Sequence, residues 1–234
     1  MNICLLSDTH GDYHYTIKQL QDIRKKVTGS IRIIQLGDFG FIGFNNDNDK
    51  KLKMLNNYLY VNDINIDFID GNHEDFVRMK SEYGLDIHLP KKQTVLSNID
   101  YIGRCTTELI NNELVMYMGG AGSFDKANRI PGKDWFMDEV ITDEDIDRVV
   151  KCDILISHDS PIGSILSNKH IDSTLHTDYT KYQYSKVFNK CKPSKVYHGH
   201  QHITYEERYV DYVNDCQVIG LNHVASKESS FLFI

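Results

Sequence analysis

The chain has 234 residues, of which 41% are hydrophobic and 25% charged, so it can bury a substantial core, and we expect one domain over residues 1–234. Its formal net charge of −7 argues against non-specific binding to nucleic acid or anionic membranes. No apolar run approaches the roughly 20 residues of a membrane-spanning helix. Five widely spaced cysteines without a CxxC pair indicate reduced thiols, which favours a cytoplasmic location.

Strands and helices alternate in the first third of the chain. Apolar runs predict strands at residues 2–6, 31–36 and 64–69, and apolar residues at helical spacing predict helices at 13–26, 52–59 and 76–79. Strands that alternate with helices form βαβ units and a largely parallel sheet, whose buried strands are continuously apolar. The chain is therefore predicted to begin βαβαβ.

The pattern changes in the second half. Asn111-Asn112 indicates a turn between antiparallel strands, and Thr142 with Asp145 three residues later resembles a helix cap. The predicted elements are strands at residues 106–110, 114–118, 153–157 and 195–197, a helix at 142–151 and a closing hairpin at 204–219. The expected fold class is α/β with α+β character, a β-sandwich of two mixed sheets flanked by α-helices.

Asp, Asn and His residues follow most of the predicted strands. They belong to five short motifs: Asp8-Thr9-His10, Gly37-Asp38, Gly71-Asn72-His73, Ser157-His158 and Gly199-His200-Gln201-His202. An α/β sheet gathers its loops at the strand ends, so we expect these motifs to converge. Mixed imidazole and carboxylate ligands suit divalent metals of intermediate hardness, and two such ions about 3.5–4 Å apart need a shared oxygen ligand. Asp38 is the natural bridge.

Each motif alone also has a plain structural reading. Asp8-Thr9-His10 is typical of a loop before a capped helix, and we interpret Asp12 and His14, just beyond it, as capping residues. Gly71-Asn72-His73-Glu74 is equally typical of a turn into a helix whose first turn accepts the acidic Glu74. The order of all five motifs, each at a strand end, favours a metal centre over coincidence.

The order DxH, GD, GNH, H and GHxH resembles that of the calcineurin-like metallophosphoesterases, and it spans Asp8 to His202, most of the chain. The resemblance implies two metal sites that share Asp38, one with Asp8, His10 and His202 as ligands and the other with Asn72, His158 and His200. It implies two divalent cations, of which manganese is favoured, while iron and zinc also suit these ligands. It further implies attack by a metal-bound hydroxide, with His73 as the general acid.

The sequence after Asp38 departs from one branch of this family. Ser/Thr protein phosphatases carry an acidic residue and an arginine there, in a GDxVDRG motif, whereas this chain reads Gly37-Asp38-Phe39-Gly40-Phe41-Ile42-Gly43. Phe41 occupies the acidic position, which counts against a protein phosphatase.

The expected function is hydrolysis of a small phosphomonoester or phosphodiester, with nucleotides and cyclic nucleotides favoured. A protein phosphatase and a catalytically inactive metal-binding scaffold of the same fold stay open as alternatives. A nuclease is a third reading, against which the net charge of −7 and the lack of a basic stripe both weigh. The sequence leaves the oligomeric state open.

Two cations in a glycine-rich connection are candidate substrate ligands. Lys126 and Arg129 follow Gly119-Gly120-Ala121-Gly122, which can pass close to the metal centre, and an arginine fork matches the geometry of phosphate. Arg129 can equally pair with Asp125 or Glu139 and hold its own loop.

Three further histidines are interpreted without a catalytic role. The long polar stretch after His158 contains His170 and His176, and it is predicted to be a lid or specificity loop. His198 alternates with the histidines of the last motif but belongs to the end of a strand, so we interpret it as structural.

Overall fold

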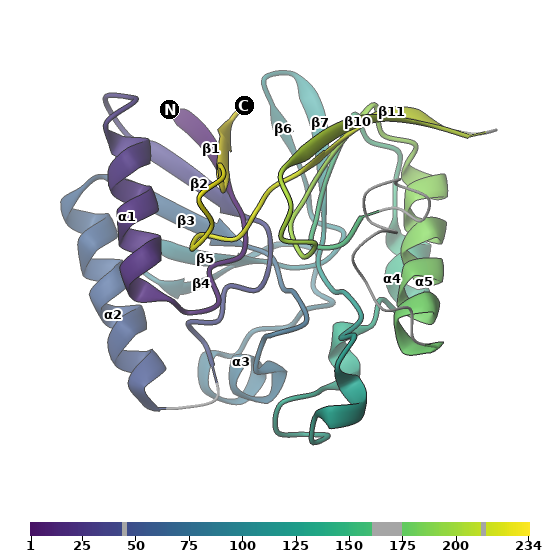
Figure 1. The fold of residues 1–234 in the computed structure, drawn as a ribbon, viewed down its shortest axis with the longest axis horizontal. Coiled ribbons are helices and arrows are strands. Elements are labelled where there is room, and N and C mark those ends of the chain that lie inside the picture. The colour runs from purple at the N-terminus through teal and green to yellow at the C-terminus, as the bar shows by residue number, and fades with distance from the viewer. Residues whose placement is uncertain (44–45, 161–174, 212–213) are drawn as a thin grey trace.

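The computed structural model describes residues 1–43, 46–160, 175–211 and 214–234 and contains two six-stranded sheets (Figure 1). The strands of the first sheet, in spatial order, are β12 (Phe231–Phe233), β1 (Asn2–Leu6), β2 (Ile31–Gln35), β3 (Ile64–Phe68), β5 (Ile99–Ile102) and β4 (Lys92–Leu96). Those of the second are β10 (Tyr205–Val210), β11 (Asp215–Gly220), β9 (Lys195–His198), β8 (Ile154–Ser157), β7 (Glu113–Met118) and β6 (Thr107–Ile110). Both sheets combine parallel with antiparallel pairs, so both are mixed, as predicted.

Helices cover the outer face of each sheet (Figure 1). The first sheet carries α1 (Tyr13–Arg24) and α2 (Asn46–Val61), and the second carries α4 (Asp143–Arg148) and α5 (Leu175–Cys191). The short helix α3 (Phe76–Tyr83) follows β3, and the 3-10 turns η1 (Lys126–Asn128) and η2 (Met137–Glu139) lie between β7 and α4. The predicted sandwich flanked by helices, with its βαβαβ start, is confirmed.

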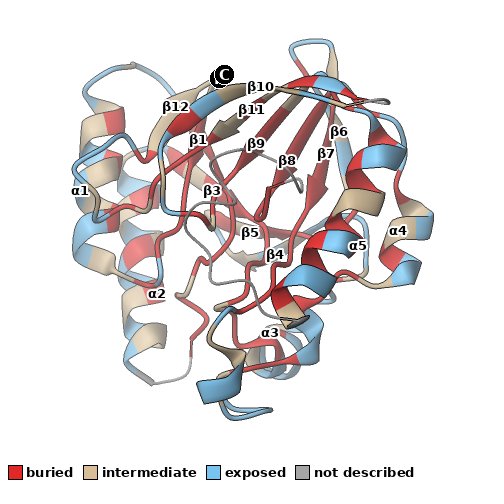
Figure 2. Ribbon diagram, turned by 45° about the vertical axis from the view of Figure 1, so that its right-hand side comes forward, coloured by how far each residue is buried: buried red, intermediate tan, exposed pale blue. Residues whose placement is uncertain are grey.

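Three buried apolar clusters hold these layers together. One lies between the two sheets and includes Ile34 and Ile156. Another packs the first sheet against Leu20 of α1 and Leu55 of α2, and the third packs the second sheet against Phe188 of α5. Figure 2 shows β7, β8 and β9 buried along most of their length, as continuously apolar strands require.

Local signals in the sequence are confirmed at a turn and at a helix start. Asn111 and Asn112 have left-handed φ angles of 52° and 68° between β6 and β7. Thr142 and Asp145 form a reciprocal capping box at the start of α4. The helix is shorter than predicted, because the backbone becomes extended at Val149.

The stretch after His158 differs from the prediction in the part that the structure describes. His176 lies in α5 rather than in a loop. Residues 161–174, which include His170, lie outside the described residues. All five cysteines are buried free thiols. None of the described helices is long and apolar enough to cross a membrane.

Candidate metal centre

The five motifs meet at one edge of the sandwich. The first three follow β1, β2 and β3 of the first sheet, and the last two follow β8 and β9 of the second. Neighbouring strands in each of these sets run parallel, so their carboxyl ends lie side by side. The structure thereby brings together all seven residues that the resemblance implied as metal ligands: Asp8, His10, Asp38, Asn72, His158, His200 and His202.

The first group consists of Asp8, His10 and His202. Oδ2 of Asp8 lies 3.1 Å from Nε2 of His202 and 3.9 Å from Nε2 of His10, and these two nitrogens are 3.0 Å apart. Ser7 donates to Asp8 Oδ1 at 2.6 Å, and the backbone N–H of His200 donates to Oδ2 at 3.1 Å. The carboxylate is therefore buried and fixed, while the two imidazoles reach it from the exposed side.

The second group consists of Asp38, Asn72, His158 and His200. Nε2 of His158 lies 3.3 Å from Asp38 Oδ1 and 3.3 Å from Asn72 Oδ1, and the His158 and His200 ring centroids are 5.0 Å apart. On its other side His158 donates its Nδ1–H to the Leu36 carbonyl at 2.7 Å. That bond orients the ring with Nε2 toward the other members of the group.

Asp38 stands between the two groups. Its Oδ1 faces His158, and its Oδ2 lies 3.8 Å from Nε2 of His10. Oδ1 also accepts the backbone N–H groups of Asn72 and His73, both at 2.9 Å, which ties the second motif to the third. A carboxylate that bridged two ions would need one oxygen on the side of each group, as Asp38 has.

Four members of the two groups have a left-handed backbone, which is uncommon for residues other than glycine. The φ angles are 47° at His10, 53° at Asp38, 62° at His200 and 52° at His202. Such conformations cost about 1–3 kcal/mol each, and surrounding structure must impose them. Gly71 permits the close approach of two loops, because a Cβ there would lie 2.2 Å from Asp38 Oδ1.

The donor set fits divalent metal ions. Ligand atoms about 2.1 Å from one ion, at tetrahedral or octahedral angles, lie about 3.0–3.4 Å from each other. The shortest contacts within the two groups, from 3.0 to 3.3 Å, fall in this range. Imidazole, carboxylate and amide oxygen ligands suit manganese, iron and zinc. Atoms of His73 lie within 4.8 Å of His10 and Asp38, so His73 is also close enough to be a ligand.

Histidines balance the buried carboxylates. Burial raises the pKa of Asp8, but the His202 hydrogen bond and the His158 charge outweigh it and hold that pKa well below its usual range. Burial is likewise outweighed at Asp38, mainly by His158 and His73, and its pKa also lies well below the usual range. Burial lowers the pKa of His158, yet Asp38 raises it to about 10. A proton and a metal ion compete for the same imidazole nitrogen, so a metal ion bound by His158 would displace a proton.

Arg129 lies beside His73. Its Nη2 is 3.0 Å from Nε2 of His73, its Nη1 donates to the Asn72 carbonyl at 3.1 Å, and its Nε pairs with Asp125 at 2.7 Å. Of the two alternative pairings, the one with Asp125 is observed, together with a contact to the third motif. Burial lowers the pKa of His73; Asp38 opposes this effect and the Arg129 guanidinium adds to it.

Lys126, the other candidate substrate ligand, lies against Trp135 and His176. Its Nζ is 4.0 Å from the Trp135 ring centroid and 3.3 Å from Nδ1 of His176. Nε2 of His176 lies 2.5 Å from Oε1 of the buried Glu139. None of these contacts is with the five motifs.

Glu74 has a role that its position in the sequence did not reveal. It is 1% exposed and accepts the N–H groups of Phe39 at 2.8 Å and Gly40 at 3.2 Å, so it fixes the loop after Asp38. Burial, followed by the charge of Asp38, raises the pKa of Glu74 to about 8. It is not a first-turn residue of α3, because that helix begins after Asp75, which is its N-cap.

Two residues with predicted structural roles have them. Asp12 caps α1 by accepting the N–H of Tyr15 at 3.1 Å. His198 is fully buried, and its ring nitrogens contact the Gly199 carbonyl at 2.8 Å and the Tyr205 hydroxyl at 2.6 Å. His198 therefore does not join either group of candidate ligands.

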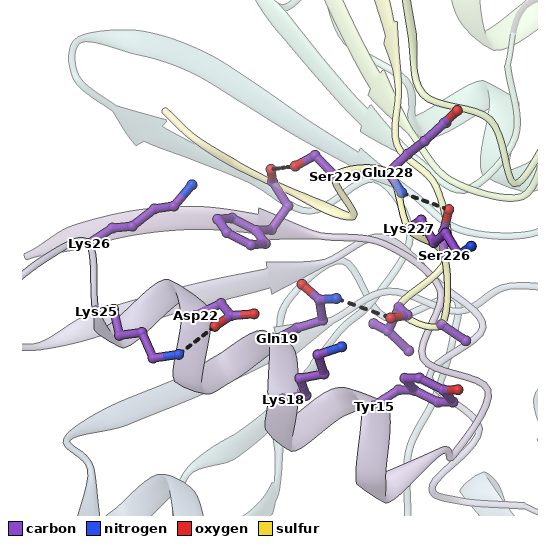
Figure 3. Close-up of a pocket in the computed structure, with 13 residues that line it drawn as sticks. Tyr15, Lys18, Gln19, Asp22, Lys25, Lys26, Ser226, Lys227, Glu228 and Ser229 are labelled. Atoms are coloured by element: carbon purple, nitrogen blue, oxygen red, sulfur yellow. Dashed lines mark hydrogen bonds and ion pairs between the residues drawn. The ribbon is translucent and has the colours of Figure 1, made fainter.

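A pocket of about 760 Å³ lies apart from the motifs, between α1 and residues 224–231 (Figure 3). Lys18 lines it from α1 and Lys25 from the C-cap of that helix, and Gln19 donates across it to the Val224 carbonyl at 3.1 Å. None of the seven implied ligands lines this pocket. The candidate chemistry therefore lies at the strand ends.

Comparison with known families decides how these motifs are classified. The sequence profile of calcineurin-like phosphoesterases matches residues 1–204, a span that contains all five motifs. The chain belongs to this family. The family resemblance inferred from the motifs is therefore confirmed; the family uses a dinuclear metal centre, and the chain has candidate ligand groups for one. A search of curated proteins found no match to the chain.

Two solved structures are similar to the chain over nearly its whole length. The crystal structure of TT1561 of Thermus thermophilus is similar with a TM-score of 0.57 and 11% identity, over 99% of this chain and 93% of that one. The phosphopantetheinyl hydrolase from Mycobacterium tuberculosis has a TM-score of 0.41 and 13% identity, over 100% of this chain and 96% of that one. At 11% identity, the similarity to TT1561 shows a shared fold and nothing more.

Proposed function

We propose that this calcineurin-like phosphoesterase hydrolyses a small phosphomonoester or phosphodiester at a dinuclear centre, with the seven residues gathered at the strand ends as ligands. Asp38 carries the proposal. Its two oxygens face His158 and His10, so one carboxylate serves both groups. Manganese is the favoured metal, with iron or zinc as alternatives. Two such ions, when bound, would neutralise phosphate oxygens and lower the pKa of the attacking water.

His73 is the proposed general acid. Its backbone N–H is held by Asp38, and its ring lies at the edge of the cluster, where it can protonate a leaving oxygen. Arg129, held by Asp125, can direct its fork at a phosphate oxygen beside the His73 ring. A bound anionic phosphate would offset the effect of Arg129 on the His73 pKa and favour the protonated ring.

The surroundings of Asp38 support a small substrate rather than a phosphoprotein. Phe41 is fully buried, and its ring centroid is 4.9 Å from that of Phe39, which in turn stacks on Phe68 at 4.3 Å. The position that is acidic in protein phosphatases thus belongs to the apolar core here. We therefore favour nucleotides and cyclic nucleotides, without a membrane or nucleic acid partner.

The test is hydrolysis by the manganese-loaded enzyme of para-nitrophenyl phosphate, its bis-ester and a panel of linear and cyclic nucleotides. We expect turnover of at least one of them. If two ions bind and nothing is turned over, the protein is a scaffold and the proposal fails.

His73→Ala tests the general acid. The variant should keep its two ions and lose about 10²–10⁴-fold in kcat on nucleotides, whose alkoxide leaving groups need a proton, and less on para-nitrophenyl esters. His14→Ala removes an exposed histidine just beyond the first motif and is the matched control. Equal turnover by the wild type and His73→Ala would move the general acid elsewhere.

A further inference from the structure

The connection between β7 and α4 holds Asn72 from two sides. Arg129 donates to the Asn72 backbone carbonyl at 3.1 Å, and Asn72 Nδ2 lies 3.1 Å from Oγ of Ser123. Both Asn72 and Ser123 are buried, at 4% and 0% exposure. The other end of the amide, Oδ1, faces Nε2 of His158 at 3.3 Å. Which end of the amide faces the second metal position therefore depends on Ser123.

A serine hydroxyl has one hydrogen to donate. Oγ of Ser123 lies 2.6 Å from Oε2 of Glu139, a carboxylate that can only accept, so the hydrogen goes to Glu139. Towards Asn72 the hydroxyl is left with lone pairs, and it can only accept. The Asn72 NH₂ group must then face Ser123, and its oxygen must face the metal position.

Glu139 is itself held in one orientation. It is 1% exposed, and its Oε1 accepts from the Ser123 N–H at 3.1 Å and from Nε1 of Trp135 at 2.7 Å. Nε2 of His176, in α5, lies 2.5 Å from the same oxygen. Oε2 is thereby left for the Ser123 hydroxyl. The direction of every hydrogen bond from Trp135 to Asn72 is fixed by the chemistry of the groups.

We propose that Ser123 and Glu139 are positioning residues that hold Asn72 with its oxygen, not its NH₂ group, toward the second metal ion. The inference rests on the proposed function, since it takes Asn72 as a ligand. An amide turned the other way would direct N–H groups at a cation. Hydrogen-bond partners of metal ligands typically contribute 10–100-fold to metal affinity, so a loss of about this size is expected when the orientation is released.

Two substitutions test this in different ways. Ser123→Ala removes the acceptor and leaves the amide free to turn. Glu139→Gln does more: donors already occupy the Oε1 side, so the new NH₂ group must face Ser123, whose hydrogen then turns toward Asn72 and favours the inverted amide. In both variants the site to which Asn72 contributes should become the weaker of the two, and manganese titration followed by calorimetry should show its affinity reduced about 10–100-fold. The tighter site should change by less than about twofold.

Asn72→Asp separates positioning from a merely structural role. Both terminal atoms of a carboxylate are oxygens, so its orientation does not matter. Adding Ser123→Ala or Glu139→Gln to Asn72→Asp should therefore cause no further loss of metal affinity at the weaker site. Ser194→Ala, at the opposite end of β9 from His198, removes an exposed hydroxyl bonded to the Asp153 carbonyl at 3.0 Å and is the matched control. Thermal unfolding of the metal-free variants checks that each one folds.

The outcomes separate the two proposals. Wild-type protein that binds fewer than two ions would overturn the dinuclear centre itself. Two ions in the wild type with an unchanged weaker site in Ser123→Ala and Glu139→Gln would overturn only the positioning role. Equal losses with and without Asn72→Asp would also overturn it, because the effect would then not pass through the amide.

Discussion

Two buried clusters of charge in this protein are neutralised in different ways. In the Arg104 cluster, the fully buried Arg104 pairs with Asp70 at 2.6 Å and with Asp145 at 3.3 Å. The proposed metal-ligand cluster consists of the seven residues gathered at the strand ends. In it, the equally buried Asp8 and Asp38 form ion pairs only with histidines among the described residues. A buried carboxylate needs a positive partner in either case. One cluster contains its own permanent cation, and the other is suited to receive cations from solution.

The largest effect is expected in the metal-ligand cluster. Asp38→Asn removes the shared charge, and we expect turnover to fall by about a thousandfold, equivalent to several kcal/mol of transition-state stabilisation. The free energy of unfolding of the metal-free protein should fall as well at neutral pH, because the pKa of Asp38 lies well below its usual range and the ionised carboxylate therefore stabilises the fold. Turnover of the bis-ester and urea unfolding in a chelator measure the two effects. Retention of more than a tenth of the activity would contradict the bridging role.

In the Arg104 cluster we expect stability to change and turnover to stay nearly constant. Asp145→Asn leaves Arg104 with one carboxylate partner, and breaking a buried pair typically costs about 3 kcal/mol of unfolding free energy. Activity per folded molecule should stay close to that of the wild type. Urea unfolding measures the loss, and Asp215→Asn, which breaks the exposed pair with Arg208, is the control. If Asp145→Asn instead lost much of its metal affinity and kept its stability, the proposed difference between the two clusters would be wrong.

The stabilisation that the Arg104 cluster provides should decrease at low pH. Burial raises the pKa of Asp145, but the Arg104 charge and the His88 hydrogen bond outweigh it, so the folded-state pKa lies well below its usual value. The contribution of Asp145 is therefore complete above about pH 4, the unfolded value, and is lost as the pH falls below it. When urea unfolding is measured from pH 6 to 2, the difference in unfolding free energy between the wild type and Asp145→Asn should become smaller below about pH 4. A constant gap would show that Asp145 is not acting through its charge.

The smallest effect is expected at the edge of the Arg104 cluster. The Tyr101 hydroxyl donates to Asp70 at 2.7 Å, while Arg104 still holds the other oxygen of that carboxylate. Tyr101→Phe should lower the free energy of unfolding by about 1.5 kcal/mol, as for a hydrogen bond to a charged group. A loss as large as that of Asp145→Asn would mean that the hydroxyl, rather than the ion pair, organises the cluster.

The metal-ligand cluster could be predicted from the sequence because its members follow apolar strands. Runs of apolar residues predict the strands, and neighbouring parallel strands have their carboxyl ends at the same edge of a sheet. Asp8 and Asp38 were therefore expected to converge, although they are 30 positions apart in the sequence. The fold followed from the same pattern. The shorter α4 did not, because helix ends depend on local backbone geometry.

The Arg104 cluster and the Ser123–Glu139 pair have no such signal. They lie in or next to irregular connections, and their partners are distant in sequence: Arg104 meets Asp145 across 41 residues, and Glu139 meets His176 across 37. Hydrophobic periodicity cannot predict such contacts, because they depend on how the connection after β7 packs. Phe41 lies between these cases, since the sequence showed that an acidic residue was missing and the structure shows the phenylalanine in the core.

The most direct test of a dinuclear centre is anomalous diffraction from a crystal of the manganese-loaded protein. Two peaks are expected at the strand ends, one near Asp8, His10 and His202 and the other near Asn72, His158 and His200, with the Asp38 carboxylate between them. A single peak, or peaks away from Asp38, would contradict the account.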